Sequence, residues 1–250
     1  MKPLRPLLAS AAAVLSLGLT ACSNSESTTT ATSTSPADSP RATTDSAPGD
    51  PRSEAALALS STVQISDLGA DWTERATQAI PDAQLNSTSG CSTLDLPAPG
   101  LRSAGAAAQF SYRLEAGAEE AQLQSIALVQ ASAADTEQTR RRLGDPQYAS
   151  CLEQDAVTFI ERAAGAPVQE VTTTPLRLAR PLDGVALRVV VHYSFSGANK
   201  VGYIDYFDHL IGRVESRIRL SRCCVPFDDS MEHALLQTTT ARITRSPINE

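Results

Sequence analysis

The stretch GVALRVVVHYSF, residues 184–195, decides the fold class, because apolar and polar side chains alternate along its length. Residues at every second position share one face of an extended strand, so this segment presents an apolar face to a core. After a turn at 196–200, the segment 201–211 is a second strand, and the reversal at Gly212 leads into a third at 214–220. The three segments together predict an antiparallel meander.

The residues before the meander add a strand pair and two helices, and those after it add one more helix. The alternation over 106–114 predicts a half-buried strand, and 122–129 is expected to pair with it. A short helix begins at Asp135, a longer one follows Pro146, and 229–243 forms a last helix. The predicted fold class is therefore α+β, an antiparallel sheet with helices packed on one face and stapled by disulfides.

The first 21 residues have the pattern of an exported and cleaved leader, with Lys2 and Arg5 before an apolar run. The run is too short for a membrane-spanning helix, which needs about 20 apolar residues. It ends in Leu19-Thr20-Ala21-Cys22, which resembles the lipobox of bacterial lipoproteins. The resemblance implies that 1–21 is a lipoprotein signal peptide and that Cys22 carries the lipid. The alternative is an ordinary secretory leader with a chance cysteine.

Residues 22–53 are predicted to be a disordered tether, because nearly every residue after Cys22 is Ser, Thr, Ala, Pro or Asp. Such a segment buries too little apolar surface to offset its ordering entropy. Residues 54–250 are then expected to form one folded domain. The expected location is the extracytoplasmic face of the cell membrane. The anchor is a set of acyl chains such as palmitate, in which each buried methylene contributes about 0.8 kcal/mol.

The charge balance narrows the range of partners. The formal net charge is −7, and loss of Lys2 and Arg5 with the leader makes the mature chain more negative still. Nucleic acid is therefore not expected as a partner. Arginine outnumbers lysine 19 to 2, a bias that resembles proteins from GC-rich actinobacterial genomes.

The sequence contains no motif of a catalytic or cofactor site. The patterns Gly-x-Ser-x-Gly, His-Glu-x-x-His, the P-loop and the dinucleotide-binding glycines are all absent. Asp205 and His209 have a spacing that suits a general base, but alternate strand positions more often form a solvated polar face. The acidic pairs 119–120 and 228–229 lack the ligand density of a calcium loop. We therefore expect no enzyme activity, no cofactor and no metal.

Four further cysteines, an even number in an exported chain, are expected to form disulfides. They are Cys91, Cys151, Cys223 and Cys224. Four cysteines allow three pairings, among which the residues alone do not decide. A metal site is the alternative, but no Cys-x-x-Cys is present.

Several local motifs, in their order along 63–243, resemble a large actinobacterial family of exported domains. This family is related to the extracellular sensor domain of a mycobacterial serine/threonine kinase. The motifs are DLGADW at 67–72, Cys91 ahead of AQF at 108–110, YASCL at 148–152, IGRV at 211–214, and the closing helix. The resemblance implies a disulfide-stapled sandwich with a groove for an unidentified envelope ligand, and no known catalytic residues. We expect Cys91 to pair with Cys151, which leaves the adjacent Cys223 and Cys224, a departure from the family, to pair with each other or to stay reduced.

The face of the meander opposite its apolar residues is the expected ligand site. The polar side chains predicted there are Arg188, His192, Arg217 and Arg219. They would draw anionic envelope molecules to an otherwise acidic domain; simple solvation of these side chains is the alternative. The sequence thus predicts a membrane-anchored envelope lipoprotein with a noncatalytic ligand-binding or sensing domain. Two other functions stay open: a carrier of a lipid or other apolar molecule, which needs an apolar cavity of roughly 300 Å³ or more, and an envelope hydrolase.

Overall fold

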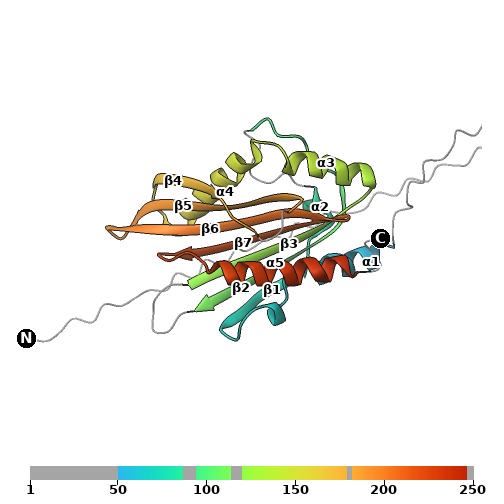
Figure 1. Cartoon of the computed structure of the whole chain (residues 1–250), viewed down its shortest axis with the longest axis horizontal. Helices are drawn as coiled ribbons and strands as arrows, with labels where there is room; N and C mark the ends of the chain where they lie inside the picture. The colour runs from blue at the N-terminus through green and yellow to red at the C-terminus, as the bar shows by residue number, and fades with distance from the viewer. Residues whose placement is uncertain (1–49, 87–93, 114–119, 179–181, 247–250) are drawn as a thin grey trace, which may run out of the picture. The chain divides into compact units, whose positions relative to one another are not determined.

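A computed structural model describes residues 50–86, 94–113, 120–178 and 182–246 of the chain (Figure 1). The strands are β1 (Trp72–Ala79), β2 (Arg102–Arg113), β3 (Glu120–Gln130), β4 (Val168–Pro175), β5 (Gly184–Phe195), β6 (Ala198–Ile211) and β7 (Val214–Cys223). The helices are α1 (Pro51–Ser61), the 3-10 helix η1 (Ile65–Asp67), α2 (Asp82–Leu85), α3 (Ala133–Leu143), α4 (Tyr148–Ala164) and α5 (Asp229–Thr244).

All seven strands form one antiparallel sheet in the order β1-β2-β3-β7-β6-β5-β4. Strands β5, β6 and β7 are the predicted meander, and β2 with β3 is the predicted strand pair. Strand β7 joins the two halves, because Arg219 stands opposite Gln124 of β3 on one side and Tyr206 of β6 on the other. The α+β class and its antiparallel sheet are therefore confirmed.

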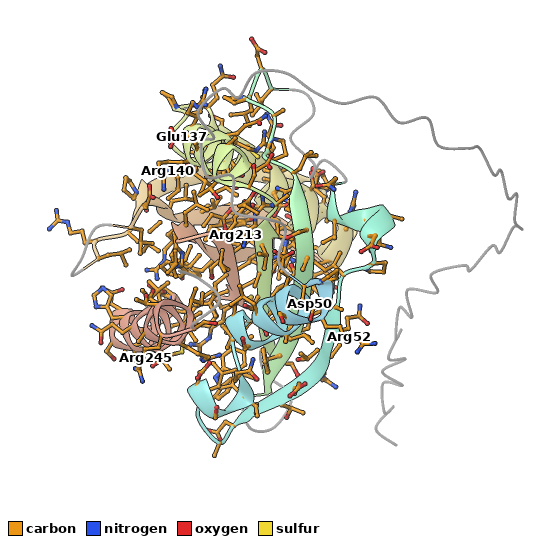
Figure 2. The ribbon with its side chains drawn as sticks, turned by 90° about the vertical axis from the view of Figure 1, so that its right-hand side faces the viewer. Asp50, Arg52, Glu137, Arg140, Arg213 and Arg245 are labelled. Atoms are coloured by element: carbon orange, nitrogen blue, oxygen red, sulfur yellow. A yellow bond between two sulfur atoms is a disulfide. The ribbon has the colours of Figure 1, made fainter. Side chains whose placement is uncertain are left out.

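Helices cover both faces of this sheet, so the expectation of helices on one face is wrong. Under α3 and α4, Leu152 and Ile160 pack in one core with Val189 and Ile204 of the sheet. On the other face, residues of α5 share a second core with Phe207 and other sheet residues, and α1 contributes to a third. Figure 2 shows α3 and α5 on opposite sides of the strands. Polar strand residues therefore lie under helices on both faces of the sheet, whichever face their side chains point to.

The edge strand β1 and the short helix α2 are not predicted by the sequence. Apart from the half-buried Trp72, every residue of β1 is exposed, so its sequence has no apolar alternation to read. The strand is held by its ladder to β2 and by the Trp72 ring, whose centre lies 5.5 Å from that of Tyr112. Tertiary pairing decides this segment, because its own side chains show no strand pattern.

Local capping sets the limits of the helices. Helix α1 begins at Pro51, where Asp50 accepts a hydrogen bond from the Arg52 backbone N–H, so folded structure begins before residue 54. Ser132 caps α3 by accepting from the Asp135 N–H at 3.1 Å. Gly165 ends α4 with a left-handed φ of 63°, which glycine adopts without steric cost. Within the described ranges, none of the helices has the length and apolar character required to span a bilayer.

Candidate functional site

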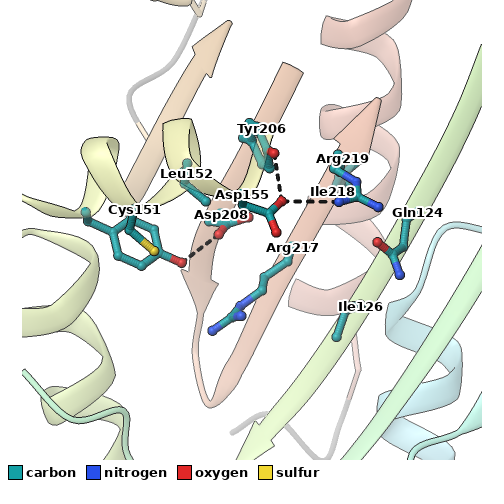
Figure 3. A pocket seen from close by; sticks show the side chains of 11 residues that line it. Gln124, Ile126, Cys151, Leu152, Asp155, Tyr206, Asp208, Arg217, Ile218 and Arg219 are labelled. Carbon is teal, nitrogen blue, oxygen red and sulfur yellow. Dashed lines mark hydrogen bonds and ion pairs between the residues drawn. The ribbon is translucent and has the colours of Figure 1, made fainter. Parts of the chain in front are cut away.

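A pocket of about 150 Å³ lies between α4 and strands β3, β6 and β7 (Figure 3). Its wall combines two arginines, two aspartates and two tyrosines with a few apolar side chains. The lining residues are Gln124, Ile126, Tyr148, Cys151, Leu152, Asp155, Tyr206, Asp208, Arg217, Ile218 and Arg219. The Asp155 side chain is 44% exposed and that of Arg219 is 23% exposed, so this part of the wall reaches solvent.

Strand register places the polar residues of the pocket floor in two neighbouring rows across the sheet. One row runs Gln124, Arg219, Tyr206, and the next runs Ile126, Arg217, Asp208. These residues share a face because strand side chains point to opposite sides at successive positions. On α4 a seven-residue spacing brings Tyr148 and Asp155 to the same side, facing this floor.

One half of the pocket is organised around Asp155. Its Oδ2 accepts hydrogen bonds from the Tyr206 hydroxyl at 2.8 Å and from Arg219 Nη1 at 3.2 Å. The Arg219 guanidinium also lies 4.4 Å from the centre of the Phe159 ring. This cation–π contact holds the flat guanidinium at the pocket wall. Burial and the neighbouring Asp155 carboxylate raise the pKa of the Tyr206 hydroxyl far above its ordinary range, so it stays a donor.

The other half is organised around Glu215, which lies buried beneath the pocket. Arg217 donates to Glu215 Oε1 from Nε at 2.7 Å and from Nη2 at 2.5 Å. Arg102 Nη2 approaches the second oxygen at 3.3 Å, and Gln130 Nε2 lies at 3.4 Å from it. Burial favours the neutral carboxylic acid, but Arg217 and Arg102 outweigh it and lower the pKa of Glu215. Two guanidinium groups therefore share one carboxylate.

Asp208 has a different environment, although it stands directly opposite Arg217 in the sheet. Its Oδ2 accepts a hydrogen bond from the Tyr148 hydroxyl at 2.7 Å. Burial raises the pKa of Asp208 to about 6, against the opposing effects of Arg217 and the Tyr148 hydrogen bond. The same burial, with the negative charge of Asp208, raises the pKa of Tyr148 well above its ordinary value. Asp208 therefore changes its charge at mildly acidic pH.

The predicted ligand residues fall on two different faces. Arg217 and Arg219 come together in the pocket, whereas Arg188 and His192 lie on the opposite face, the one that α5 partly covers. Arg188 donates to Asp205 at 2.7 and 3.0 Å and to Glu232 of α5 at 2.9 Å. His192 is half-buried beyond it. The expectation that all four share one free face is wrong, because the register puts Arg188 opposite Asp205 of β6 but Arg217 and Arg219 opposite Asp208 and Tyr206, whose side chains point to the other face.

The cysteines are only partly described. Cys223 and Cys224 are bonded to each other, which is one of the two states left open by the sequence. Cys151 faces the pocket and is disulfide-bonded. Cys91 and Cys22 lie outside the described residues, so the pairing of Cys91 with Cys151 and the lipidation of Cys22 stay predictions.

The described residues that line the pocket include no histidine. His209 is 1% exposed and lies on the β6 face opposite the pocket, and burial lowers its pKa to about 4. Among the residues that the structure describes, no group of three or more His, Cys, Asp or Glu side chains is placed to hold a metal ion.

The sequence alone did not identify the acidic and phenolic half of the site. Asp155 appears in the sequence as one polar residue within the apolar repeat of α4, and no motif in the sequence marks Asp208. A signal existed in the alternation of β6, which puts Asp208 on the same face as the apolar Ile204 and Leu210.

Comparison with known proteins gives no match to any family model, to any curated protein or to any solved structure. The arrangement itself defines a polar pocket, lined by two arginines, two aspartates and two tyrosines, on an α+β domain.

Proposed function

We propose that this chain is a lipid-anchored lipoprotein of an actinobacterial cell envelope, and that its domain binds a small anionic ligand in the α4 pocket without catalysis. The observation that carries the proposal is the pair Arg217 and Arg219, which face one pocket from alternate positions of β7. The leader ending at Cys22 supports the membrane anchor. The motif resemblance to the exported sensor-like domains supports ligand sensing as the role.

The size of the pocket favours a small ligand over a lipid. A cavity of this volume, about 150 Å³, accepts a molecule of roughly the size of benzene. Sites for drug-sized molecules run from about 300 to 1,000 Å³ and are mostly apolar. The α4 pocket is smaller and carries four charged side chains, so it suits a compact polar group better than an acyl chain.

A hydrolase is the second candidate, because one observation favours it. Asp155 and Asp208 line the same pocket, and the pKa of Asp208 is raised to about 6 by burial. Glycoside hydrolysis uses two carboxyl groups, one as acid and one as base or nucleophile, and the acid is a group whose pKa is raised. Against this, both groups are engaged: Asp155 accepts from Tyr206 and Arg219, and Asp208 accepts from Tyr148. Turnover of envelope glycan fragments that is lost in Asp155→Asn would favour the hydrolase.

Ligand binding is tested with the full chain in detergent by thermal denaturation with benzoate or with its neutral analogue benzamide. We expect benzoate to raise the melting temperature of the wild type and of Arg141→Gln, a control on α3 whose side chain is 69% exposed. The Arg219→Gln variant should lose this shift. A binding ligand stabilises by RT ln(1 + [L]/Kd), about 1.4 kcal/mol at ten times Kd. Equal shifts in Arg219→Gln and wild type, or equal shifts with benzamide, contradict the proposal.

Membrane anchoring is tested separately by cell fractionation. The Cys22→Ala variant should leave the membrane fraction or accumulate with its leader uncut. A variant that is cleaved and anchored like the wild type contradicts the lipobox.

A further inference from the structure

The cluster of charged groups at α3 and α4 contains more arginines than carboxylates. Four guanidinium groups lie there, from Arg102, Arg142, Arg217 and Arg219. Arg102 and Arg217 share Glu215, and Arg219 pairs with Asp155. Arg142 donates to the Pro97 carbonyl oxygen at 2.6 Å and lies over the Tyr148 ring, at 5.8 Å from its centre. No ion pair of Arg142 occurs within the described part of the chain.

Asp208 is the one remaining carboxyl group of this cluster, and among the described residues no guanidinium donates a hydrogen bond to it. Arg217 stands opposite it in the sheet, yet the guanidinium is directed to Glu215. The described residues contain no ion pair to Asp208, whose Oδ2 instead accepts from the Tyr148 phenol. With all groups ionised the cluster has a net charge of one positive unit, and a proton on Asp208 raises it to two. Buried charge without a counter-ion is unfavourable, so the cluster is short of negative charge.

A ligand anion and the Asp208 carboxylate would therefore compete for the same positive field. The charged and titratable groups around Asp208 come from four elements. Among the described residues they include no further cation that balances the charges of the Asp208 carboxylate and a ligand anion at the same time. They are Tyr148 and Asp155 of α4, Tyr206 of its own strand, Glu215 and Arg217 of β7, and, behind the Tyr148 ring, Arg142 of α3. Two anions close together in a low-dielectric site repel strongly, so one of them takes up a proton or leaves.

We propose that the α4 pocket binds a small oxyanion together with one proton, and that Asp208 is the group that receives this proton. The inference rests on the proposed function and names the regulation of that site. The neutral Asp208 keeps its hydrogen bond to Tyr148, because a carboxylic acid still has acceptor oxygens. The proton is available near neutral pH, since burial already raises the pKa of Asp208 to about 6. Affinity for an oxyanion should thus increase as the pH falls.

The size of the effect follows from linkage between proton and ligand binding. With one proton taken up and a free-state pKa of about 6, the affinity at pH 7.5 should be about 25-fold weaker than at pH 5.5. At pH 7.5 each binding event should consume close to one proton, because almost all of the free protein has Asp208 ionised.

Isothermal titration with sulfate, which keeps its charge over this range, tests the inference on the full chain in detergent. Bis-Tris, imidazole and Tris chlorides serve as buffers, since sulfonate buffers would compete. The number of protons taken up is obtained from the dependence of the binding enthalpy on the buffer. Benzoate is titrated in parallel. Comparing the affinities for sulfate and benzoate shows whether the site prefers a tetrahedral oxyanion or a planar carboxylate.

Three variants make the outcome specific. Asp208→Asn should bind sulfate at pH 7.5 as tightly as the wild type does at pH 5.5, with no proton uptake. Asp183→Asn, a matched control at an exposed acid paired with Arg140, should behave as the wild type. Arg219→Gln should lose binding at both pH values. Absence of oxyanion binding at every pH overturns the proposed function itself. Wild-type binding without proton uptake, or an unchanged pH dependence in Asp208→Asn, overturns the proton coupling and leaves the proposed function standing.

Discussion

Replacing Glu215 by glutamine should destabilise the fold far more than the same change at Glu137. Each carboxylate pairs with two arginines, Glu215 in the core and Glu137 on the surface of α3. The Glu215 side chain is 0% exposed and its partner Arg102 is 4% exposed. Removing one member of a buried charge pair costs about 3–5 kcal/mol, because the remaining charge has no partner and no water.

The Glu137 pairs give the matched control. Glu137 is 51% exposed, and its partners Arg140 and Arg141 are 44% and 69% exposed. Exposed pairs of this kind contribute about 0.2–1 kcal/mol, so Glu137→Gln should change the free energy of unfolding by less than about 1 kcal/mol. A domain with a typical stability of about 5–15 kcal/mol keeps a measurable transition in both variants.

Urea denaturation at pH 7.5, followed by circular dichroism, measures both differences. The pKa of Glu215 is lowered in the folded state, so its contribution is present above the ordinary carboxyl pKa and is lost as the pH falls through the folded value. The gap between Glu215→Gln and wild type should therefore shrink in acid. Similar losses for Glu215→Gln and Glu137→Gln at pH 7.5 would refute the assignment of Glu215 as the buried counter-ion of two arginines.

Three further predictions concern stability. The pKa of Asp208 is raised to about 6, so its stabilising contribution is present below the unfolded pKa and is lost as the pH rises through 6. In urea titrations the free energy of unfolding of Asp208→Asn should exceed that of the wild type by up to about 3 kcal/mol at pH 7.5 and should equal it at pH 4. The pKa of His209 is lowered to about 4, so its contribution of about 3 kcal/mol to the free energy of unfolding is present above pH 6.5 and is lost towards pH 4. His209→Gln should therefore lose less stability in acid than the wild type. Asp208→Asn should lose more, because acid stabilises the wild type through Asp208 and destabilises it through His209. Ser132→Ala should cost about 1 kcal/mol by removing the α3 cap, whereas an unchanged thermal transition would contradict the capping role.

The strands could be predicted from the sequence wherever one of their faces is apolar. The alternation in β5 and in β2 placed both strands and the faces they bury, because side chains at every second position meet the same core. Strand β1 could not be predicted, since its residues are exposed and its conformation comes from pairing with β2.

The polar alternate positions were misread for a physical reason. A sequence does not distinguish a solvated polar face from one whose charges are paired under a helix. In the sequence Arg188 and Arg217 have the pattern of solvated strand residues. In the structure Arg188 pairs with Glu232 of α5, and Arg217 lies in the pocket under α4. Because of this, the sequence could group Arg217 and Arg219 on one face, where both line the α4 pocket, but gave no position for their partners.

The acidic half of the pocket depends on contacts between distant parts of the chain. Tyr148 and Asp208 are 60 residues apart, and Asp155 and Tyr206 are 51 residues apart. Their meeting follows from the packing of α4 on β6, which no local pattern specifies. Burial by that packing also raises the pKa of Asp208, so the proton affinity of the site is a property of the tertiary structure.

Native mass spectrometry of the lipoprotein purified from its own host tests the central claim most directly. Wild type and Arg219→Gln are isolated side by side at pH 5.5, where we expect the tightest binding. The wild type should carry a small acidic molecule that Arg219→Gln lacks. Identical bound masses on the two proteins, whether a lipid or nothing at all, would contradict the assignment of the α4 pocket as an anion-binding site.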